Sequence, residues 1–213
     1  MLSSVPIPGN PWPHDMVLTI EDDSQTLLDL LWVREAWSLQ PAGDDLAPLL
    51  SVTPVGAHNE AVRVGKIAEW QEAWPAMWQA CLQHAGQIRD ATVFEQLHGT
   101  AIGSDERTFL LHEIFGPSWR DVLGDEAFTD QYLVWNQAQF EVNSHRRYQS
   151  LEGEPERVSL GALIPAWQAG LSKVVVIPCR GSFTRVIGQH TLLLTAETRD
   201  DPKRYSEALK LFQ

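Results

Sequence analysis

The sequence predicts an α+β protein, with a mostly helical body and a small antiparallel sheet formed largely by a hairpin near the C-terminus. Two observations lead to this prediction. Apolar side chains recur at spacings of three and four through most of residues 24–170, which is the period of amphipathic helices. Residues 173–195 are instead rich in β-branched residues and are interrupted by turns that contain glycine. We therefore expect one globular domain over residues 16–213, with a β-hairpin and a final helix over residues 173–213.

The first fifteen residues are predicted to be a separate extended arm. Residues 1–15 contain four prolines, which favour an extended chain over helix or sheet. They contain no basic residue and no apolar core of a signal peptide, so we do not expect a secretory signal. Because such an arm has no core of its own, Trp12 is expected to anchor it to the body or to a second subunit. The arm is therefore also a candidate contact for a homo-oligomer.

The first half of the domain is predicted to hold a short strand, a helix and a loop. Met16 to Ile20 is a β-prone run and a candidate strand. Ser24 is a suitable N-cap for a helix that continues to about Leu39. Residues 40–58 are rich in proline and glycine and are expected to form a loop. At most one short strand or turn is expected within it, near Leu49 to Val55.

A second long helical pattern begins near Asn59, which is a plausible cap. Pro75 interrupts it, so either this helix kinks or a second helix begins there. One stripe of the pattern is continuous and consists of Ile67, Trp70, Trp74, Met77, Trp78, Cys81 and Leu82.

Four further segments complete the helical prediction. Ser104 is expected to cap a helix over residues 105–115, because the acidic residues that follow suit a helix start. A long helix is expected over residues 125–147 and a short one over residues 159–167. Asp201 and Pro202 are expected to begin the last amphipathic helix.

The β-rich end is predicted to be a hairpin. Lys173 to Cys179 is strand-like, and residues 180–182 form a turn. Phe183 to Thr195 is expected to form one or two further strands around Gly188. Because two close strands with a short connection favour antiparallel pairing, we predict an antiparallel sheet.

Composition excludes several classes of protein. Apolar residues make up 44% and charged residues 21% of the chain, which is ordinary for a globular protein and unlike a disordered one. No apolar stretch is long enough to span a membrane. The net charge of −12 repels a phosphate backbone, so general nucleic-acid binding is not expected. Since only two cysteines are present, we expect both to be reduced thiols in the cytoplasm.

One short motif could carry catalytic chemistry. Residues 179–185, Cys-Arg-Gly-Ser-Phe-Thr-Arg, fit the pattern Cys-x5-Arg and follow a predicted strand. Over these seven residues, and nowhere else, the chain resembles the active loop of the cysteine phosphatases. The resemblance implies a thiolate nucleophile at Cys179 and an oxyanion-binding group at Arg185. The chain departs from that pattern at Pro178, at Val186 and in the strand-like residues that follow, where such a loop opens into a helix. A hairpin turn with a buried cysteine is the alternative interpretation.

The remaining polar candidates are isolated. Arg180 and Arg185 flank the turn and could bind a carboxylate or phosphate, or simply pair with surface acids. His190 is a candidate catalytic group beside the same turn. His112 and Glu113 begin the zinc motif His-Glu-x-x-His, but position 116 is glycine. Because the histidines have no metal-binding spacing, we predict no metal and no cofactor.

Nine tryptophans in 213 residues are an unusual feature. Trp70, Trp74 and Trp78 recur every four residues along one predicted helix. Such a stripe can line a groove for a flat ligand or a partner helix, or it can fill a helical core. The apolar residues that share the stripe favour the core.

These observations favour a cytoplasmic interaction or regulatory protein over an enzyme. An acidic surface without catalytic motifs indicates a protein partner, and a basic partner would complement its charge. Its candidate contacts are the exposed acids Asp44, Asp45, Asp200 and Asp201. The first alternative is a hydrolase or transferase with a dispersed site near residues 179–185. The second is a small-molecule binder with a pocket lined by the tryptophan stripe.

Overall fold

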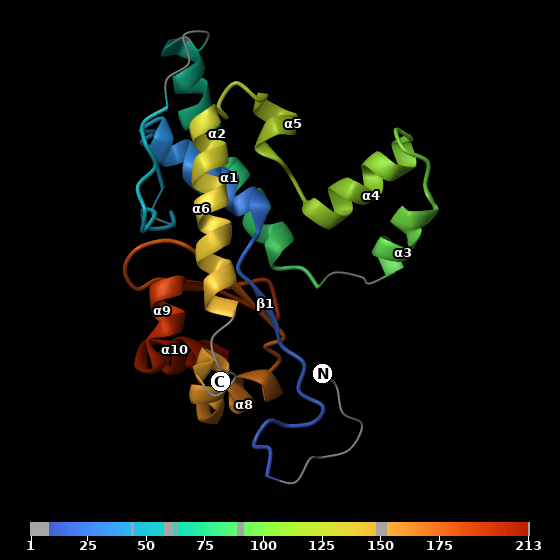
Figure 1. Ribbon diagram of the computed structural model, residues 1–213, viewed down its shortest axis with the longest axis vertical. Coiled ribbons are helices and arrows are strands. Elements are labelled where there is room, and N and C mark those ends of the chain that lie inside the picture. The colour runs from blue at the N-terminus through green and yellow to red at the C-terminus, as the bar shows by residue number, and fades with distance from the viewer. Residues whose placement is uncertain are drawn as a thin grey trace.

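A four-stranded sheet lies between two groups of helices, as the computed structural model of the chain shows (Figure 1). The structure describes residues 9–43, 45–57, 62, 64–88, 92–147 and 153–212. Its elements in chain order are β1 (Thr19–Glu21), α1 (Gln25–Ala36), α2 (Val64–Ala85), α3 (Thr92–Gly99), α4 (Asp105–Phe115), α5 (Trp119–Leu123), α6 (Asp130–Arg147), α7 (Pro155–Val158), α8 (Leu160–Gln168), β2 (Lys173–Ile177), β3 (Thr184–Ile187), β4 (Thr191–Thr195), α9 (Ala196–Asp200), α10 (Pro202–Leu209) and the 3₁₀ helix η2 (Lys210–Phe212). The α+β class predicted from the sequence is confirmed.

The sheet is mixed, which corrects the prediction of an antiparallel sheet. Its strand order is β1-β2-β4-β3, and only β3 and β4 pair in antiparallel fashion. β2 pairs in parallel with β1 on one side and with β4 on the other. The connection after β2 carries the chain to the sheet edge, so β4 returns between β2 and β3. The predicted hairpin therefore exists around Gly188, but β2 is not part of it.

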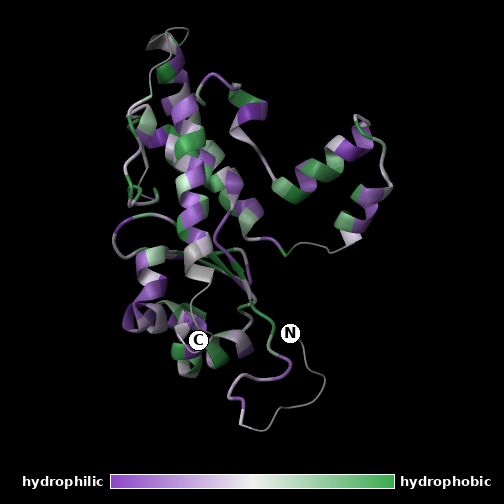
Figure 2. Ribbon diagram, viewed as in Figure 1, coloured by the Kyte–Doolittle hydropathy of each residue, from purple (hydrophilic) through white to green (hydrophobic). Residues whose placement is uncertain are grey.

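Both faces of the two central strands are buried, as is usual for parallel strands covered by helices. Alternate side chains belong to two different cores. Val175, Ile177 and Leu193 pack with α1 and α2, whereas Val174 and Leu192 pack with α8 and α10. The hydropathy colouring shows the apolar sheet between these two helical groups (Figure 2). The sheet thus divides the interior into two hydrophobic cores.

Two glycines allow the β3–β4 turn to contact the end of α2. Gly188 has φ +68°, and a Cβ atom there would lie 2.6 Å from the carbonyl oxygen of Gly86. A Cβ atom on Gly86 would in turn lie 2.9 Å from the backbone of Ile187. Thr191 strengthens the contact, because its hydroxyl donates a hydrogen bond to the carbonyl oxygen of Gly86 at 3.3 Å. Any larger residue at either glycine would separate the turn from the helix.

The helices predicted from the sequence are present in the structure, but several of their ends differ. α2 continues through Pro75 as one helix, and Asn59, its predicted cap, lies outside the described residues. Ser104 caps α4, because its hydroxyl accepts a hydrogen bond from the amide of Arg107 at 3.1 Å. Asp201 caps α10 through the amides of the next turn. α3 was not predicted, and α6 begins at Asp130 rather than at residue 125.

The described part of the N-terminal arm packs on the body. The indole N–H of Trp12 donates a hydrogen bond to the carbonyl oxygen of Met16 at 3.1 Å, and its ring packs at the edge of the α8–α10 core. The guanidinium of Arg157 lies over the same ring, 5.8 Å from its centre. Within the described ranges, no helix combines the length and the apolar content that crossing a bilayer requires.

The tryptophan stripe forms the centre of the larger core. Trp70, Trp74 and Trp78 are each 0% exposed. The rings of Trp74 and Trp78 stack at 5.4 Å, and the indole N–H of Trp74 donates to the carbonyl oxygen of Leu30 at 2.8 Å. The stripe therefore joins α2 to α1 mainly through buried aromatic surface.

A buried ion pair joins three elements beside this core. Lys173 and Glu21 are less than 10% exposed, and their charged atoms lie 2.6 Å apart across β2 and β1. The Lys173 ammonium also donates to the carbonyl oxygen of Ala85, at the end of α2, at 2.9 Å. A charge buried in this way depends on its partner, because the interior solvates it poorly.

We predict that replacing Trp78 with alanine lowers the free energy of unfolding by about 3–5 kcal/mol, because it removes a fully buried aromatic side chain and leaves a cavity. Urea denaturation measures the change. Val134→Ala, at a site that is 72% exposed, is the control and should change stability by less than about 0.5 kcal/mol. A Trp78→Ala protein of unchanged stability would contradict the assignment of this side chain to the core.

We also predict that Glu21→Gln lowers the free energy of unfolding by about 3–5 kcal/mol, because it leaves the Lys173 ammonium buried without its counter-charge. The double variant Glu21→Leu/Lys173→Met should recover most of that loss. Glu207→Gln, which breaks the exposed ion pair with Lys210, is the control and should cost less than about 1 kcal/mol. If the single and double variants are equally unstable, the ion pair is not the cause.

Candidate functional site

The turn after β2 does not have the geometry of a phosphate-binding loop. Cys179 is 0% exposed and forms an isolated antiparallel bridge with Leu50. Burial raises the pKa of the Cys179 thiol to about 12, and the neighbouring guanidinium of Arg34 only partly offsets this effect. The chain continues from the turn into β3 rather than into a helix, so no helix N-terminus faces the thiol. A thiolate nucleophile needs a low pKa and access to substrate, and this cysteine has neither.

The two arginines of the turn bind the loop before α2. Arg180 donates to the carbonyl oxygen of Leu50 at 3.1 Å and to the hydroxyl of Thr53 at 3.0 Å. Arg185 lies 3.5 Å from the carboxylate of Asp45 and also reaches the side chain of Gln79. Both guanidinium groups therefore join the turn to its neighbours. Arg185 pairs with a surface acid, as one alternative predicted, whereas Arg180 binds a carbonyl oxygen and a hydroxyl.

The other predicted groups lie in separate places. His190 makes a 2.9 Å hydrogen bond with the carbonyl oxygen of Gly170 through Nδ1, and His112 is exposed on α4. In the part of the chain that the structure describes, no three His, Cys, Asp or Glu side chains gather in a way that could hold a metal ion. Trp70, Trp74 and Trp78 lie in the larger core, where each is 0% exposed, so their rings form no surface groove.

The acidic residues predicted to contact a partner lie in different parts of the chain and have different surroundings. Asp44 lies outside the described residues, whereas Asp45 pairs with Arg185. Asp201 caps α10, and the hydrogen bond from the Arg204 amide is the main cause that lowers the pKa of its carboxyl group. Asp200 lines a cavity that the sequence did not predict.

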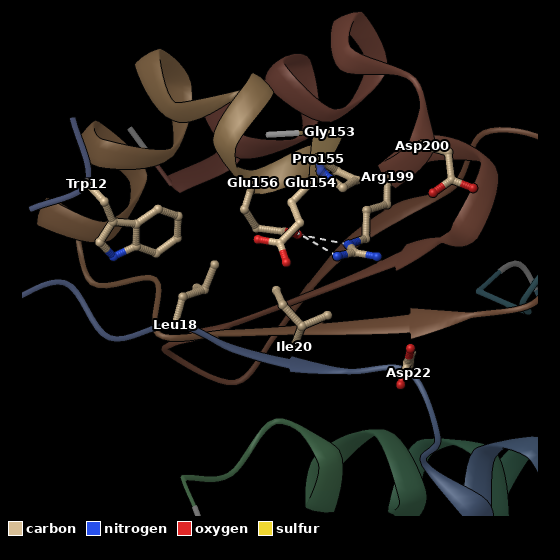
Figure 3. Close-up of a pocket in the computed structure, with 10 residues that line it drawn as sticks. All are labelled: Trp12, Leu18, Ile20, Asp22, Gly153, Glu154, Pro155, Glu156, Arg199 and Asp200. Atoms are coloured by element: carbon tan, nitrogen blue, oxygen red, sulfur yellow. Dashed lines mark hydrogen bonds and ion pairs between the residues drawn. The ribbon is translucent and has the colours of Figure 1, made fainter. Parts of the chain in front are cut away.

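That cavity has a volume of about 590 Å³ and is built from four separate segments. Trp12 comes from the arm, Leu18, Ile20 and Asp22 from the β1 segment, and the remaining residues from the α7 and α9 regions (Figure 3). Figure 3 shows the β1 side chains facing Glu156 and Arg199 across the space. The full lining is Trp12, Leu18, Ile20, Asp22, Gly153, Glu154, Pro155, Glu156, Arg199 and Asp200. The lining is thus partly apolar and partly charged.

A buried hydrogen-bonded group makes the charged wall rigid. Arg199 donates from Nε and Nη2 to the two carboxylate oxygens of Glu156, at 2.8 and 2.7 Å. The hydroxyl of Tyr205 donates to the same carboxylate at 3.1 Å. Burial, followed by the charge of Glu156, raises the pKa of Tyr205 well above its usual value, so this hydroxyl remains a donor. The bidentate pair fixes both side chains in one orientation.

A second feature that the sequence missed is α3, which pairs with the predicted helix α4. We name residues 92–115 the α3–α4 hairpin; it projects to one side of the body (Figure 1). Its two helices pack mainly on each other, and Arg107 of α4 donates to the carbonyl oxygen of Leu97 of α3 at 3.1 Å. Its exposed large apolar side chains are Phe94, Ile102, Phe109 and Phe115.

The hairpin is attached to the end of α2 through His84. The ring Nε2 of His84 lies 2.9 Å from the carbonyl oxygen of Glu113. Gly116 follows α4 with φ +79°, and a Cβ atom there would lie 2.4 Å from the same ring. The contact therefore requires glycine at this position.

Sequence signals for these two features differ in strength. Val93, Phe94 and Leu97 have the spacing of a short amphipathic helix and could have indicated α3. The cavity has no comparable signal, because its walls come from segments more than 130 residues apart in the chain. Glu156 lies in a polar stretch with a glycine and a proline, which is typical of a loop that connects two elements.

We predict that both cysteines react slowly with a thiol reagent in the folded protein. Cys81 and Cys179 are buried, and burial raises the pKa of each thiol from about 9 to about 12. Because the unfolded chain loses these protons first, stability should be full below about pH 9 and should fall as the pH rises toward 12. Ellman's reagent at neutral pH, with and without denaturant, measures the reactivity. Cys81→Ser isolates the signal of Cys179, and rapid labelling of that folded variant would restore the nucleophile interpretation.

The cavity beside Arg199 and the exposed apolar side chains of the α3–α4 hairpin are candidate binding features of the described chain. The two residues that suggested phosphatase chemistry have structural roles: Cys179 is buried, and Arg185 binds Asp45 and Gln79. Comparison of the chain with protein-family models, with curated proteins and with solved structures found no match.

Proposed function

We propose that this chain is a cytoplasmic interaction protein and that its α3–α4 hairpin binds an amphipathic helix of a partner protein. One observation carries the proposal. α3 buries none of its residues, although it contains the apolar side chains of Val93, Phe94 and Leu97. A helix gains most of its stability in a protein by burying its apolar face, so an unburied face suggests a missing partner.

The neighbouring apolar side chains extend the same surface. Ile102, at the tip of the hairpin, is 94% exposed, and Phe109 of α4 is 67% exposed. Phe109 lines a shallow hollow on α4 together with Asp105, Thr108, His112 and Glu113. Exposed aromatic side chains on a helical surface suit recognition of a second helix through residues spaced by three and four.

The charge around this surface suggests the chemistry of the partner. Residues 92–115 contain four carboxylates (Glu95, Asp105, Glu106 and Glu113) and one guanidinium (Arg107). Together with the net charge of −12, this favours a partner helix flanked by lysine or arginine. Two reduced cysteines fit a cytoplasmic protein.

Site-specific photocrosslinking tests this proposal. Benzoylphenylalanine in place of Phe109 should capture a partner in a native lysate. The same group in place of Leu133, which is 64% exposed on α6, should not capture it. The captured segment should be an amphipathic helix with basic flanks, and a synthetic peptide of that segment should compete with capture.

The peptide also allows affinity to be measured. Phe115→Ser should weaken peptide binding by about tenfold or more, the effect of losing one large apolar contact. Val134→Ser, on α6, is the matched control and should leave the affinity unchanged. Equal capture at Phe109 and Leu133 would contradict the proposal, and so would capture of only a second copy of this chain.

A further inference from the structure

We infer that a small cavity between the start of α1 and the end of α6 binds a small neutral molecule that carries a primary amide or urea group. We name it the α6 cavity, and its volume is about 70 Å³. The polar groups that the argument uses are the carboxamides of Gln25, Asn136, Gln139 and Asn143 and the hydroxyl of Ser144, which all line this cavity. None of the lining residues belongs to the α3–α4 hairpin, so the inference does not depend on the proposed protein partner.

The carboxamides of α6 continue the face that this helix packs against the body. Tyr132 and Trp135, nearer the start of the helix, are buried in the larger core. The stripe continues at spacings of four residues with Gln139 and Asn143, where apolar side chains would extend the core. A buried polar side chain is unfavourable unless it is hydrogen-bonded. The change from aromatic to amide side chains therefore favours a polar binding site over simple packing.

The side-chain amide of Gln139 is the observation that carries the inference. Gln139 is only 6% exposed, and within the described chain no group forms a hydrogen bond with this amide. The residue lines the α6 cavity, whose volume of about 70 Å³ exceeds the roughly 10–15 Å³ that one water molecule needs. The space beside Gln139 can therefore hold a molecule larger than water, and that molecule would satisfy the amide.

Two neighbouring amides have orientations that other contacts fix. The Nε2 atom of Gln25 donates to the carboxylate of Asp29 at 2.8 Å and to the hydroxyl oxygen of Tyr132 at 2.6 Å. The Nδ2 atom of Asn143 donates to the carbonyl oxygen of Asp22 at 2.7 Å. Because these contacts use the NH₂ groups, the amide oxygens are the atoms that remain to accept hydrogen bonds from a ligand.

The α6 cavity thus combines hydrogen-bond acceptors with donors. The oxygens of Gln25 and Asn143 accept, whereas the NH₂ group of Gln139 and the hydroxyl of Ser144 can donate. No lysine or arginine is among the described residues that line the cavity, so an anion would lack a counter-charge. A cation without an acceptor would leave the NH₂ group of Gln139 unpaired. An amide or urea has both a carbonyl oxygen and NH₂ protons, and it can pair with both kinds of group.

Two-dimensional NMR of the side-chain NH₂ groups in ¹⁵N-labelled protein tests the inference. The probe is acetamide. Its analogues of the same shape are the anion acetate, the cation acetamidinium and acetone, which lacks the NH₂ group. Acetamide should shift the Gln139 resonance in a saturable manner, with the millimolar dissociation constant expected of a ligand with about four non-hydrogen atoms. Each analogue should bind at least tenfold more weakly.

Gln139→Met and Gln137→Met are a matched pair of variants on α6. Gln139→Met identifies the Gln139 resonance and should weaken acetamide binding about tenfold, as followed at the Asn143 resonance. It should not lower the melting temperature, because it removes a buried amide that has no partner in the described chain. Gln137 is exposed and donates to the carboxylate of Glu141 at 3.0 Å, so the same change there should leave the affinity unchanged.

Three results would contradict the inference. The first is the absence of a saturable Gln139 shift with acetamide far above the millimolar range, which would mean that the cavity holds only water. The second is equal binding of acetone or of either charged analogue, which would mean that the amide group is not recognised. The third is equal affinity of Gln139→Met and Gln137→Met for acetamide. Because the first two results are obtained with the unmodified protein, they decide the matter even if Gln139→Met does not fold.

Discussion

The two central strands must be covered on both faces, and the rest of the structure depends on this constraint. Every residue of β2 and β4 is buried. One layer of helices cannot cover both faces of the sheet, so α1 and α2 cover one face and α8 to α10 cover the other face. The order of strands follows from the same need, because the two less buried strands, β1 and β3, take the edges. Apolar burial of this extent is the main favourable term in folding.

Two groups of buried charges fix how the layers meet. On the α2 side, Lys173 joins β2 to Glu21 of β1 and to the end of α2. On the other side, Glu156 joins α7 to α9 through Arg199 and to α10 through Tyr205. Each group satisfies its charges with hydrogen bonds, which is the condition for burying them. Since such contacts are directional, they specify a relative orientation that apolar packing alone leaves less defined.

The α3–α4 hairpin and the cavity beside Arg199 lie outside this well-packed interior. The α3–α4 hairpin contacts the body mainly near His84 and exposes aromatic side chains. The cavity opens where the arm, β1, α7 and α9 approach one another without filling the space between them. Both surfaces are therefore available to other molecules without unfolding of either core. Their chemistry differs, because the hairpin presents apolar rings among acidic residues and the cavity is lined by charged and apolar residues together.

The sequence by itself determined the fold class, most helices and the burial pattern of the tryptophan stripe. These features depend on local periodicity, which neighbouring residues such as Trp70, Trp74 and Trp78 display directly. It did not determine that β2 pairs in parallel, since hydrogen-bond partners that are distant in sequence leave no local pattern. The cavity forms only in the tertiary structure, which brings its four segments together. Trp12 and Arg199 are far apart along the chain, and Glu156 gains its fixed position only when Arg199 and Tyr205 fold against it.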